Sequence, residues 1–160
     1  MRQDDVAGIL LIQAACYPPS MQEDEATIRA RLAAAPDSAW VASDGDGICA
    51  YLAAYRSQLG KVTPLAGRFE PAPAADCLYL HDLAVAPRAG GRGLGPQLAA
   101  TAWQAARGEG LGYSALVSVQ ESQPFWRRLG YAVHDALEPL QRQRLSSYDA
   151  PAWYMVKRLD

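Results

Sequence analysis

Residues 83–95 read LAVAPRAGGRGLG, in which a short apolar run leads into four glycines within six positions. An alanine- and glutamine-rich segment that is expected to be helical, 96–107, follows at once. Closely spaced glycines let several backbone N–H groups turn toward one point, and a helix N-terminus adds partial positive charge there. The stretch therefore predicts a turn that binds phosphate or pyrophosphate, although glycine-rich tight turns without a ligand are also common.

Two widespread phosphate-binding motifs do not match this turn. A Walker loop requires GxxxxGK[ST], and the chain contains no Gly-Lys-Ser or Gly-Lys-Thr. A dinucleotide-binding turn requires GxGxxG in the first strand–helix unit, whereas here Pro96 takes the place of the third glycine. The turn also follows half of the chain, so both interpretations are set aside.

Periodic segments surround the turn on both sides. Apolar spacing predicts helices over 5–16, 23–35, 96–107 and 124–129, and strands over 39–43, 48–56, 77–85, 113–119, 131–136 and 153–159. Asp44-Gly45-Asp46-Gly47 is a hairpin signal between the first two strands. The proline-rich stretch Gly60–Asp76 has neither period and is interpreted as an irregular loop, either functional or disordered. This order predicts a mixed α/β domain around one sheet.

Composition limits the class of protein. The chain has 160 residues and a formal net charge of −2, with a pI of about 5.7. One domain over residues 1–160 suits this length, and the mixed charges give no reason to expect nucleic acid as a partner. No apolar run approaches the roughly 20 residues of a membrane span, and no signal peptide is apparent, so we expect a cytoplasmic protein without a membrane partner. The cysteines Cys16, Cys49 and Cys77 fit no zinc spacing, so we expect reduced thiols and no metal.

Two segments together resemble the GNAT superfamily of N-acetyltransferases. The run LAVAPRAGGRGLG is similar to its signature, in which a strand leads into [QR]xxGx[GA] and a helix. The segment SVQESQPFWRRLGY, about 30 residues later, resembles its second signature, a strand followed by FYxxxGF. The resemblance covers roughly residues 39–133. It implies one central, mixed, mostly antiparallel twisted sheet of about six to seven strands, flanked by about four helices.

The resemblance also implies acetyl-CoA as co-substrate. Main-chain groups of Leu83, Ala84 and Val85 would meet the pantetheine arm like an added strand. Trp126 would pack against the pantetheine arm. The pyrophosphate would lie on the turn and the helix start, whose residues are Gly90, Gly91, Arg92, Gly93, Leu94, Gly95 and Pro96. Pro96 lacks an N–H. Its place in the first turn of the helix makes this harmless, because N–H groups there have no acceptor within the helix.

This sequence departs from the family pattern at two positions. The Gln or Arg that opens the turn motif falls on Gly90, and Arg88 or Arg92 is expected to supply the missing charge. The tyrosine that often protonates the departing thiolate falls on Trp126, whose indole N–H is a poor acid. Ser122 or Tyr131 are the alternative donors; we expect water to serve instead.

His81 is the candidate general base. Its reference pKa of about 6.5 suits proton removal near neutrality, and it lies on the strand that leads to the turn. Strand alternation predicts that Tyr79, His81 and Leu83 share one face, with Leu80 and Asp82 on the other. Tyr79 would then hold the imidazole or a water that carries the proton, and Asp82 would be structural.

Residues 79–85, YLHDLAV, are similar to the arylalkylamine N-acetyltransferase branch. In that branch two histidines on this strand deprotonate the amine through water. Only the second histidine, His81, is kept here, because Tyr79 takes the first place. The segment CYPPSMQEDEATIRARLAAAP resembles that branch's first inter-helix loop. Phe69, in the proline-rich loop, is a further candidate to touch a substrate.

The sequence therefore predicts transfer of an acetyl group from acetyl-CoA directly to the primary amine of a small molecule, with His81 acting through water. A protein or peptide N-acetyltransferase and a non-catalytic acyl-CoA-binding module are the alternatives. No residue pattern identifies the acceptor amine, and a homodimer is compatible with the sequence.

Overall fold

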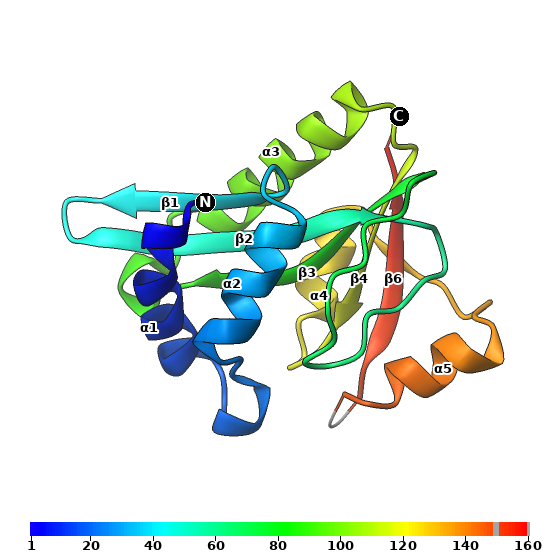
Figure 1. The fold of residues 1–160 in the computed structure, drawn as a ribbon, viewed down its shortest axis with the longest axis horizontal. Helices are drawn as coiled ribbons and strands as arrows, with labels where there is room; N and C mark the ends of the chain where they lie inside the picture. The colour runs from blue at the N-terminus through cyan, green and yellow to red at the C-terminus, as the bar shows by residue number, and fades with distance from the viewer. Residues whose placement is uncertain (149–150, 160) are drawn as a thin grey trace.

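The computed structural model describes residues 1–148 and 151–159 and contains one open, mixed sheet. Its strands lie in the order β1-β2-β3-β4-β6-β5 (Figure 1). The strands are β1 (Ala39–Asp44), β2 (Gly47–Ser57), β3 (Cys77–Val85), β4 (Tyr113–Ser118), β5 (Ala132–Val133) and β6 (Trp153–Arg158). The helices of the described residues are α1 (Val6–Cys16), α2 (Glu25–Ala34), α3 (Leu94–Gly108), α4 (Gln123–Arg128) and α5 (Pro139–Leu145).

The pairing pattern confirms the predicted fold class. β3 and β4 are parallel, and the other neighbouring strands pair antiparallel. The chain returns from β3 to β4 through α3, which is the crossover that a parallel pair requires. The structure also contains α5, which the sequence pattern did not predict, and β5 is shorter than the predicted strand.

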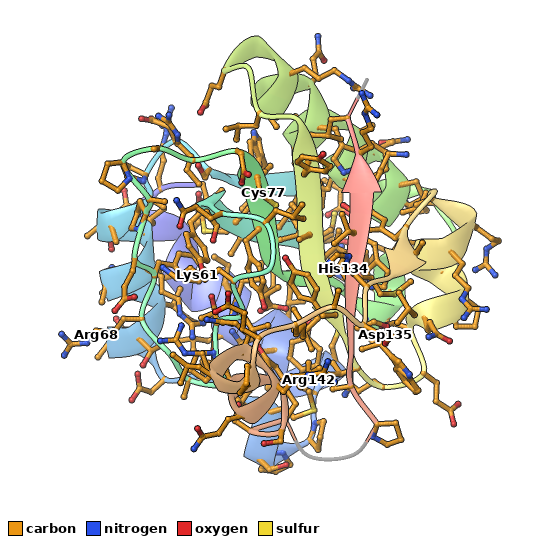
Figure 2. The ribbon with its side chains drawn as sticks, turned by 90° about the vertical axis from the view of Figure 1, so that its right-hand side faces the viewer. Lys61, Arg68, Cys77, His134, Asp135 and Arg142 are labelled. Carbon is orange, nitrogen blue, oxygen red and sulfur yellow. The ribbon has the colours of Figure 1, made fainter. Side chains whose placement is uncertain are left out.

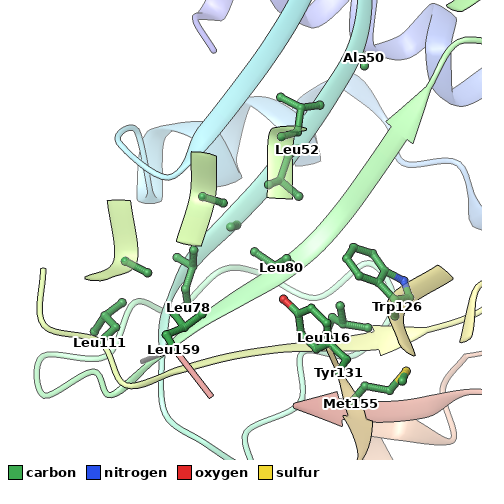
Figure 3. Close-up of a cluster of buried hydrophobic side chains, with 14 residues drawn as sticks. Ala50, Leu52, Leu78, Leu80, Leu111, Leu116, Trp126, Tyr131, Met155 and Leu159 are labelled. Carbon is green, nitrogen blue, oxygen red and sulfur yellow. The ribbon is translucent and has the colours of Figure 1, made fainter. Parts of the chain in front are cut away.

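Helices cover both faces of the sheet, as Figure 1 shows. α3 and α4 bury the apolar core on one face, where Leu80, Leu98, Leu116 and Trp126 belong to one cluster (Figure 3). On the other face α1 and α2 pack over Tyr51 and Ala84. Burial of large apolar side chains of this kind contributes roughly 1.5–3 kcal/mol each and holds the strands of the site in place.

The proline-rich loop lies against the sheet on the same side as α5. Figure 2 shows Lys61 and Arg68 on this loop and Arg142 on α5. The loop is anchored from inside, since Val62 and Phe69 are buried with Tyr55 and Leu137 in one cluster. The expectation of an irregular loop is confirmed, and Val62 and Phe69 pack from it into the core.

α2 begins two residues later than the sequence pattern predicts. Asp24 is its N-cap, and the Asp24 carboxylate accepts a hydrogen bond from the N–H of Thr27 at 2.7 Å. An N-cap aspartate satisfies one of the unpaired donors of a first turn, which makes this the favoured start. Glu23 therefore lies before the helix, in the α1–α2 connection, and its side chain is directed inward with 8% exposure.

A β-bulge at His81 overturns the predicted alternation along β3. Ala53 of β2 pairs with Asp82, and the next residue, Ala54, pairs with Leu80, so His81 is the extra residue. A bulge places two consecutive side chains on one face. Accordingly, the rings of Tyr79 and His81 are neighbours, and Asp82 contacts Tyr51 on the same face. Leu83 joins the cluster of Leu80 on the opposite face.

β3 and β4 separate beyond the bulge. Their parallel pairing ends at Leu80 and Leu116, although β3 continues to Val85 and β4 to Ser118. The backbone edge of β3 that faces β4 is therefore not used in strand pairing from His81 onward. An unpaired strand edge offers N–H and C=O groups to an extended ligand.

Candidate active site

A cavity of about 180 Å³ lies where β3 and β4 separate. Its walls come from four parts of the chain: the α1–α2 connection, β3, the β4–α4 segment and the residues around the long loop and α5. The lining residues are Tyr17, Met21, Glu23, Leu65, Leu80, His81, Asp82, Leu83, Leu116, Val117, Val119, Gln120, Ser122, Phe125, Trp126 and Tyr148. Apolar walls with a few polar groups directed inward are typical of small-molecule sites.

His81 lines this cavity with a side chain that is only 5% exposed. Its Nε2 lies 3.4 Å from Oε1 of Glu23. Its Nδ1 is buried and has no hydrogen-bond partner among the described residues. The ring is held by Phe69, whose ring meets it edge-on at 5.2 Å between centroids. A buried, unpaired ring nitrogen at a cavity needs a water or a ligand as partner.

Glu23 joins His81 to a buried arginine. The Oε2 atom of Glu23 accepts a short hydrogen bond from Nη1 of Arg31, and both side chains are less than a tenth exposed. Burial raises the pKa of Glu23, but the contacts with His81 and Arg31 outweigh it, so the pKa lies below its usual range. Arg31 also donates to the carbonyl of Gly67 and lies over the Phe69 ring at 5.0 Å.

Asp82 is held by two tyrosines. The hydroxyls of Tyr17 and Tyr51 each donate a short hydrogen bond to one of its carboxylate oxygens. Burial raises the pKa of Asp82, although the two hydroxyl donors act in the opposite direction. Both oxygens are thus occupied, and the structural role of Asp82 stays a prediction.

Tyr79 lies beside the cavity and not on its wall. Its side chain is 1% exposed, and its ring centroid is 6.3 Å from that of His81. Its hydroxyl is buried. Burial, then the neighbouring Tyr148, raises its pKa well above the ordinary value of 10. Tyr79 is therefore a neutral phenol at neutral pH. Its predicted role in holding His81 or a water stays a prediction.

The glycine turn has the backbone that an anion site requires. Gly91 and Gly93 have φ values of +74° and +73°, which L side chains rarely adopt. Gly93 is the N-cap of α3, so the N–H groups of Leu94 and Gly95 have no acceptor within the helix. A Cβ on Gly95 would meet the Phe125 ring at 3.3 Å, so this glycine allows α3 to pack against α4.

Both arginines near the turn contact Asp44 at the tip of β1. Nη1 of Arg88 lies 2.8 Å from each Asp44 oxygen, and Nη2 of Arg88 donates to the carbonyl of Ile48. Arg92 donates through Nη1 alone, at 2.8 Å, and its side chain is 51% exposed. Arg88 is thus tied to the β1–β2 hairpin by three bonds, whereas most donors of Arg92 remain available to solvent.

The second signature lies on the opposite wall of the cavity. Trp126, 7% exposed, lines it and packs edge-on against Phe125 and Tyr131. Ser122 also lines the cavity, with its Oγ 3.0 Å from that of Ser118. Tyr131 does not, because its hydroxyl is engaged in the core with Trp103 and Ser114.

Sequence reasoning named His81, Leu83, Ser122 and Trp126 of this cavity. It also singled out the inter-helix segment that contains Tyr17 and Glu23, but it assigned no role to either residue. The signal for Glu23 was hidden, because acidic residues at a helix start are usually solvated. Phe69 does not line the cavity and instead contacts the His81 ring. Within the described residues no group of His, Cys, Asp and Glu is arranged to hold a metal ion. Nor does any described helix have the length and apolar character to cross a membrane.

Comparison with solved structures places this fold among known ones. The chain aligns over 100% of its length with 97% of a GNAT-like decarboxylase, GphF, solved in complex with isobutyryl-CoA, at 18% identity and a TM-score of 0.78. It aligns with 95% of Ard1 from Thermoplasma volcanium, again over its full length, at 14% identity and a TM-score of 0.74. Rv2747 from Mycobacterium tuberculosis, in complex with CoA and NLQ, aligns over 99% of this chain and 96% of its own, at 17% identity and a TM-score of 0.68.

By sequence, no curated protein gives a significant match. The model of the acetyltransferase (GNAT) family, however, matches residues 7–131. This range runs from α1 through both signatures to Tyr131 and so includes the glycine turn, the β3 bulge and most of the cavity wall. The chain therefore belongs to the acetyltransferase (GNAT) family.

Proposed function

We propose that this protein transfers an acetyl group from acetyl-CoA directly to the primary amine of a small molecule, with His81 as general base through a water. The observation that carries the proposal is His81, which lines the cavity between β3 and β4 and whose buried Nδ1 has no hydrogen-bond partner among the described residues. The resemblance of residues 79–85 to the arylalkylamine branch supports an amine as acceptor.

The residues present fit acetyl-CoA as co-substrate. The free edge of β3 at Leu83, Ala84 and Val85 suits an extended pantetheine arm. The left-handed glycines and the start of α3 suit a pyrophosphate, with Gly90, Arg92 and Pro96 completing the turn. Trp126 and Phe125 form an apolar wall for the acyl end.

The reaction requires one proton to leave before the carbon–nitrogen bond forms. His81 accepts a proton from the ammonium through water, which frees the nitrogen lone pair. The nitrogen attacks the thioester carbonyl carbon, the carbon–sulfur bond breaks, and the sulfur leaves with the electron pair. The acylated nitrogen still carries one excess proton, which passes through water near Ser122 to the departing thiolate. The proton held by His81 is released through water to solvent, which restores the neutral base. Holding both reactants together removes the need for an acetylated enzyme.

The shape of the cavity favours a small acceptor over a peptide. Leu65 from the long loop and Met21 from the α1–α2 connection both contribute to its wall, and Arg31 ties the long loop down at Gly67. A volume of about 180 Å³ is small for an extended chain with several side chains. Both carboxylates of the wall are engaged, Glu23 by Arg31 and Asp82 by the tyrosines. We therefore expect a compact monoamine, and not a polycation.

A thiol-release assay with a panel of acceptors tests this proposal. Arylalkylamines and other small monoamines should support CoA release, whereas polyamines, aminoglycosides and peptides should be slower. Preference for peptides would favour the protein N-acetyltransferase alternative. CoA binding without release for any amine would favour a non-catalytic acyl-CoA-binding module.

Arg92→Ala is expected to weaken CoA binding about tenfold, because a charge-assisted hydrogen bond to phosphate contributes roughly 1.5–3 kcal/mol. Arg88→Ala is the matched control, since its guanidinium is committed to Asp44 and Ile48. We expect Arg88→Ala to change the dissociation constant of CoA by no more than about threefold. A tenfold change, as expected for Arg92→Ala, corresponds to roughly 1.4 kcal/mol. Isothermal titration calorimetry measures both, and a larger loss for Arg88→Ala would reverse the assignment.

Trp126→Tyr is expected to retain acetyl transfer and to raise it if the new hydroxyl protonates the thiolate. Because Trp126 also packs in the core with Phe125 and Tyr131, we expect a loss of about 1 kcal/mol in unfolding free energy. Single-turnover kinetics and thermal denaturation separate the two effects. A fall of more than about tenfold in the transfer step, roughly 1.4 kcal/mol, in a folded variant would give the indole a role of its own.

A further inference from the structure

The α1–α2 connection brings a carboxylate to the candidate base. Oε1 of Glu23 is the only described acceptor within hydrogen-bonding range of Nε2 of His81, at 3.4 Å. The connection is fixed at this point, because the N–H of Glu23 donates to Oε1 of the buried Gln13 at 2.8 Å. The carboxylate is thus held by its backbone on one side and by Arg31 on the other.

The charge state of Glu23 determines which ring nitrogen of His81 carries the proton. With its pKa held below the usual range, Glu23 is a carboxylate at neutral pH and can only accept a hydrogen bond. A neutral imidazole that faces it must therefore present Nε2–H. Nδ1 is then the nitrogen with the lone pair, and Nδ1 is the atom that lacks a partner.

We propose that Glu23 is the positioning residue of His81, fixing the Nε2–H tautomer and leaving Nδ1 as the atom that takes the proton of the amine. This inference rests on the proposed acetyl transfer to an amine. When Nδ1 gains the proton, the imidazolium stands beside the Glu23 carboxylate, which stabilises it. Arg31 pairs with the same carboxylate and offsets part of its charge.

Several ionisable groups face His81 and bear on its titration. They are Glu23 from the α1–α2 connection, Arg31 from α2, Tyr17 after α1, Tyr79 and Asp82 from β3, and Tyr148 after α5. The pKa values of the tyrosines are raised by burial, so these side chains stay neutral across the working range. Glu23 and Arg31 are the two groups of this set that pair with each other beside His81, and each can be replaced separately.

Opposite pH shifts are the expected signature of this arrangement. Glu23→Gln removes a negative charge beside Nε2, so the midpoint of kcat/KM for the amine should move down by about one pH unit. Its plateau should fall about 10- to 100-fold, as for outer partners of functional histidines. Arg31→Gln leaves the carboxylate uncompensated, so its midpoint should move up. A purely structural role for the pair predicts no such opposition.

Glu25→Gln is the matched control, because it also replaces a glutamate that pairs with an arginine. Glu25 and its partner Arg29 are exposed to solvent, whereas Glu23 is buried. We expect this variant to keep the wild-type midpoint and rate within about twofold. Affinity for acetyl-CoA should be unchanged in Glu23→Gln, because the glycine turn and the β3 edge hold the co-substrate mainly through main-chain groups. Equal profiles for Glu23→Gln and wild type would overturn the proposal.

The tautomer of His81 can be tested without turnover and without changing Glu23 or Arg31. Two-bond proton–nitrogen NMR correlations of the wild-type imidazole, with His134→Ala for assignment, should show Nε2–H as the neutral form of His81. An Nδ1–H form would overturn the role of Glu23, whatever the enzyme acetylates. If instead Nε2–H is found but no amine is acetylated, the proposed function fails while the positioning contact stands.

Discussion

Replacing His81 with alanine should lower kcat/KM for the amine by about 10²–10⁴-fold at pH 7, the range typical of general-base removal. The reason is that an alkylammonium, with a pKa near 10.4 as in lysine, must lose its proton before attack. The loss should shrink toward pH 9, because more of the amine then arrives deprotonated. Steady-state rates across pH 6–9 at limiting amine measure both effects.

The binding of acetyl-CoA provides the control for His81→Ala. The glycine turn and the β3 edge hold the co-substrate mainly through main-chain groups, so its dissociation constant should stay within about threefold of wild type. A shared pH profile and a rate within about threefold would instead make His81 a packing residue between Phe69 and Tyr79. The base would then be sought at Tyr79, Asp82 or the long loop.

Gly93→Asp should raise the dissociation constant of CoA by about 100-fold or more, equivalent to about 2.8 kcal/mol. The new carboxylate would stand at the N-cap of α3, where the pyrophosphate is expected, and a side chain at φ +73° adds roughly 1–2 kcal/mol of strain. The nearest atom to an added Cβ is Nε2 of Gln97 at 3.9 Å, so there is room for the side chain and we expect a folded variant. Calorimetry with CoA measures the loss.

Gly110→Asp is the matched control for this change. Gly110 follows the other end of α3, has a φ of +76° and has open space around an added Cβ. The two variants thus carry the same charge and similar backbone strain at opposite ends of one helix. CoA binding should survive in Gly110→Asp, and undiminished binding by folded Gly93→Asp would place the pyrophosphate elsewhere.

The fold was predictable because its elements carry strong local signals. The glycine turn, the hairpin at Asp44–Gly47 and the apolar strand Cys77–Val85 were all expected from spacing and turn chemistry, and the structure confirms them. α5 was missed because Pro139–Leu145 is short and has no buried residues, so it shows no apolar periodicity.

The site was predictable in part, for a physical reason. His81 and Trp126 lie on segments that resemble family signatures, whereas the bulge at His81 leaves no mark in the residues of β3 alone. Alternation therefore assigned Asp82 and Leu83 to the wrong faces. The sequence pattern placed Glu23 at the start of the helix. The observed start after Asp24 is favoured by one capping hydrogen bond, which the pattern of residues does not reveal. Long-range contacts such as Glu23–His81 are set by tertiary packing, which a local pattern does not contain.

The central claim is direct transfer of the acetyl group to a small amine within this cavity. Single-turnover mixing with acetyl-CoA and the preferred amine of the panel, followed by mass spectrometry of protein and products, tests it most directly. The account predicts one acetylated amine for each CoA thiol released and no acetylated protein preceding the product. Acetyl-protein that forms first and passes its group to the amine, or thiol release without acetylated amine, would contradict it.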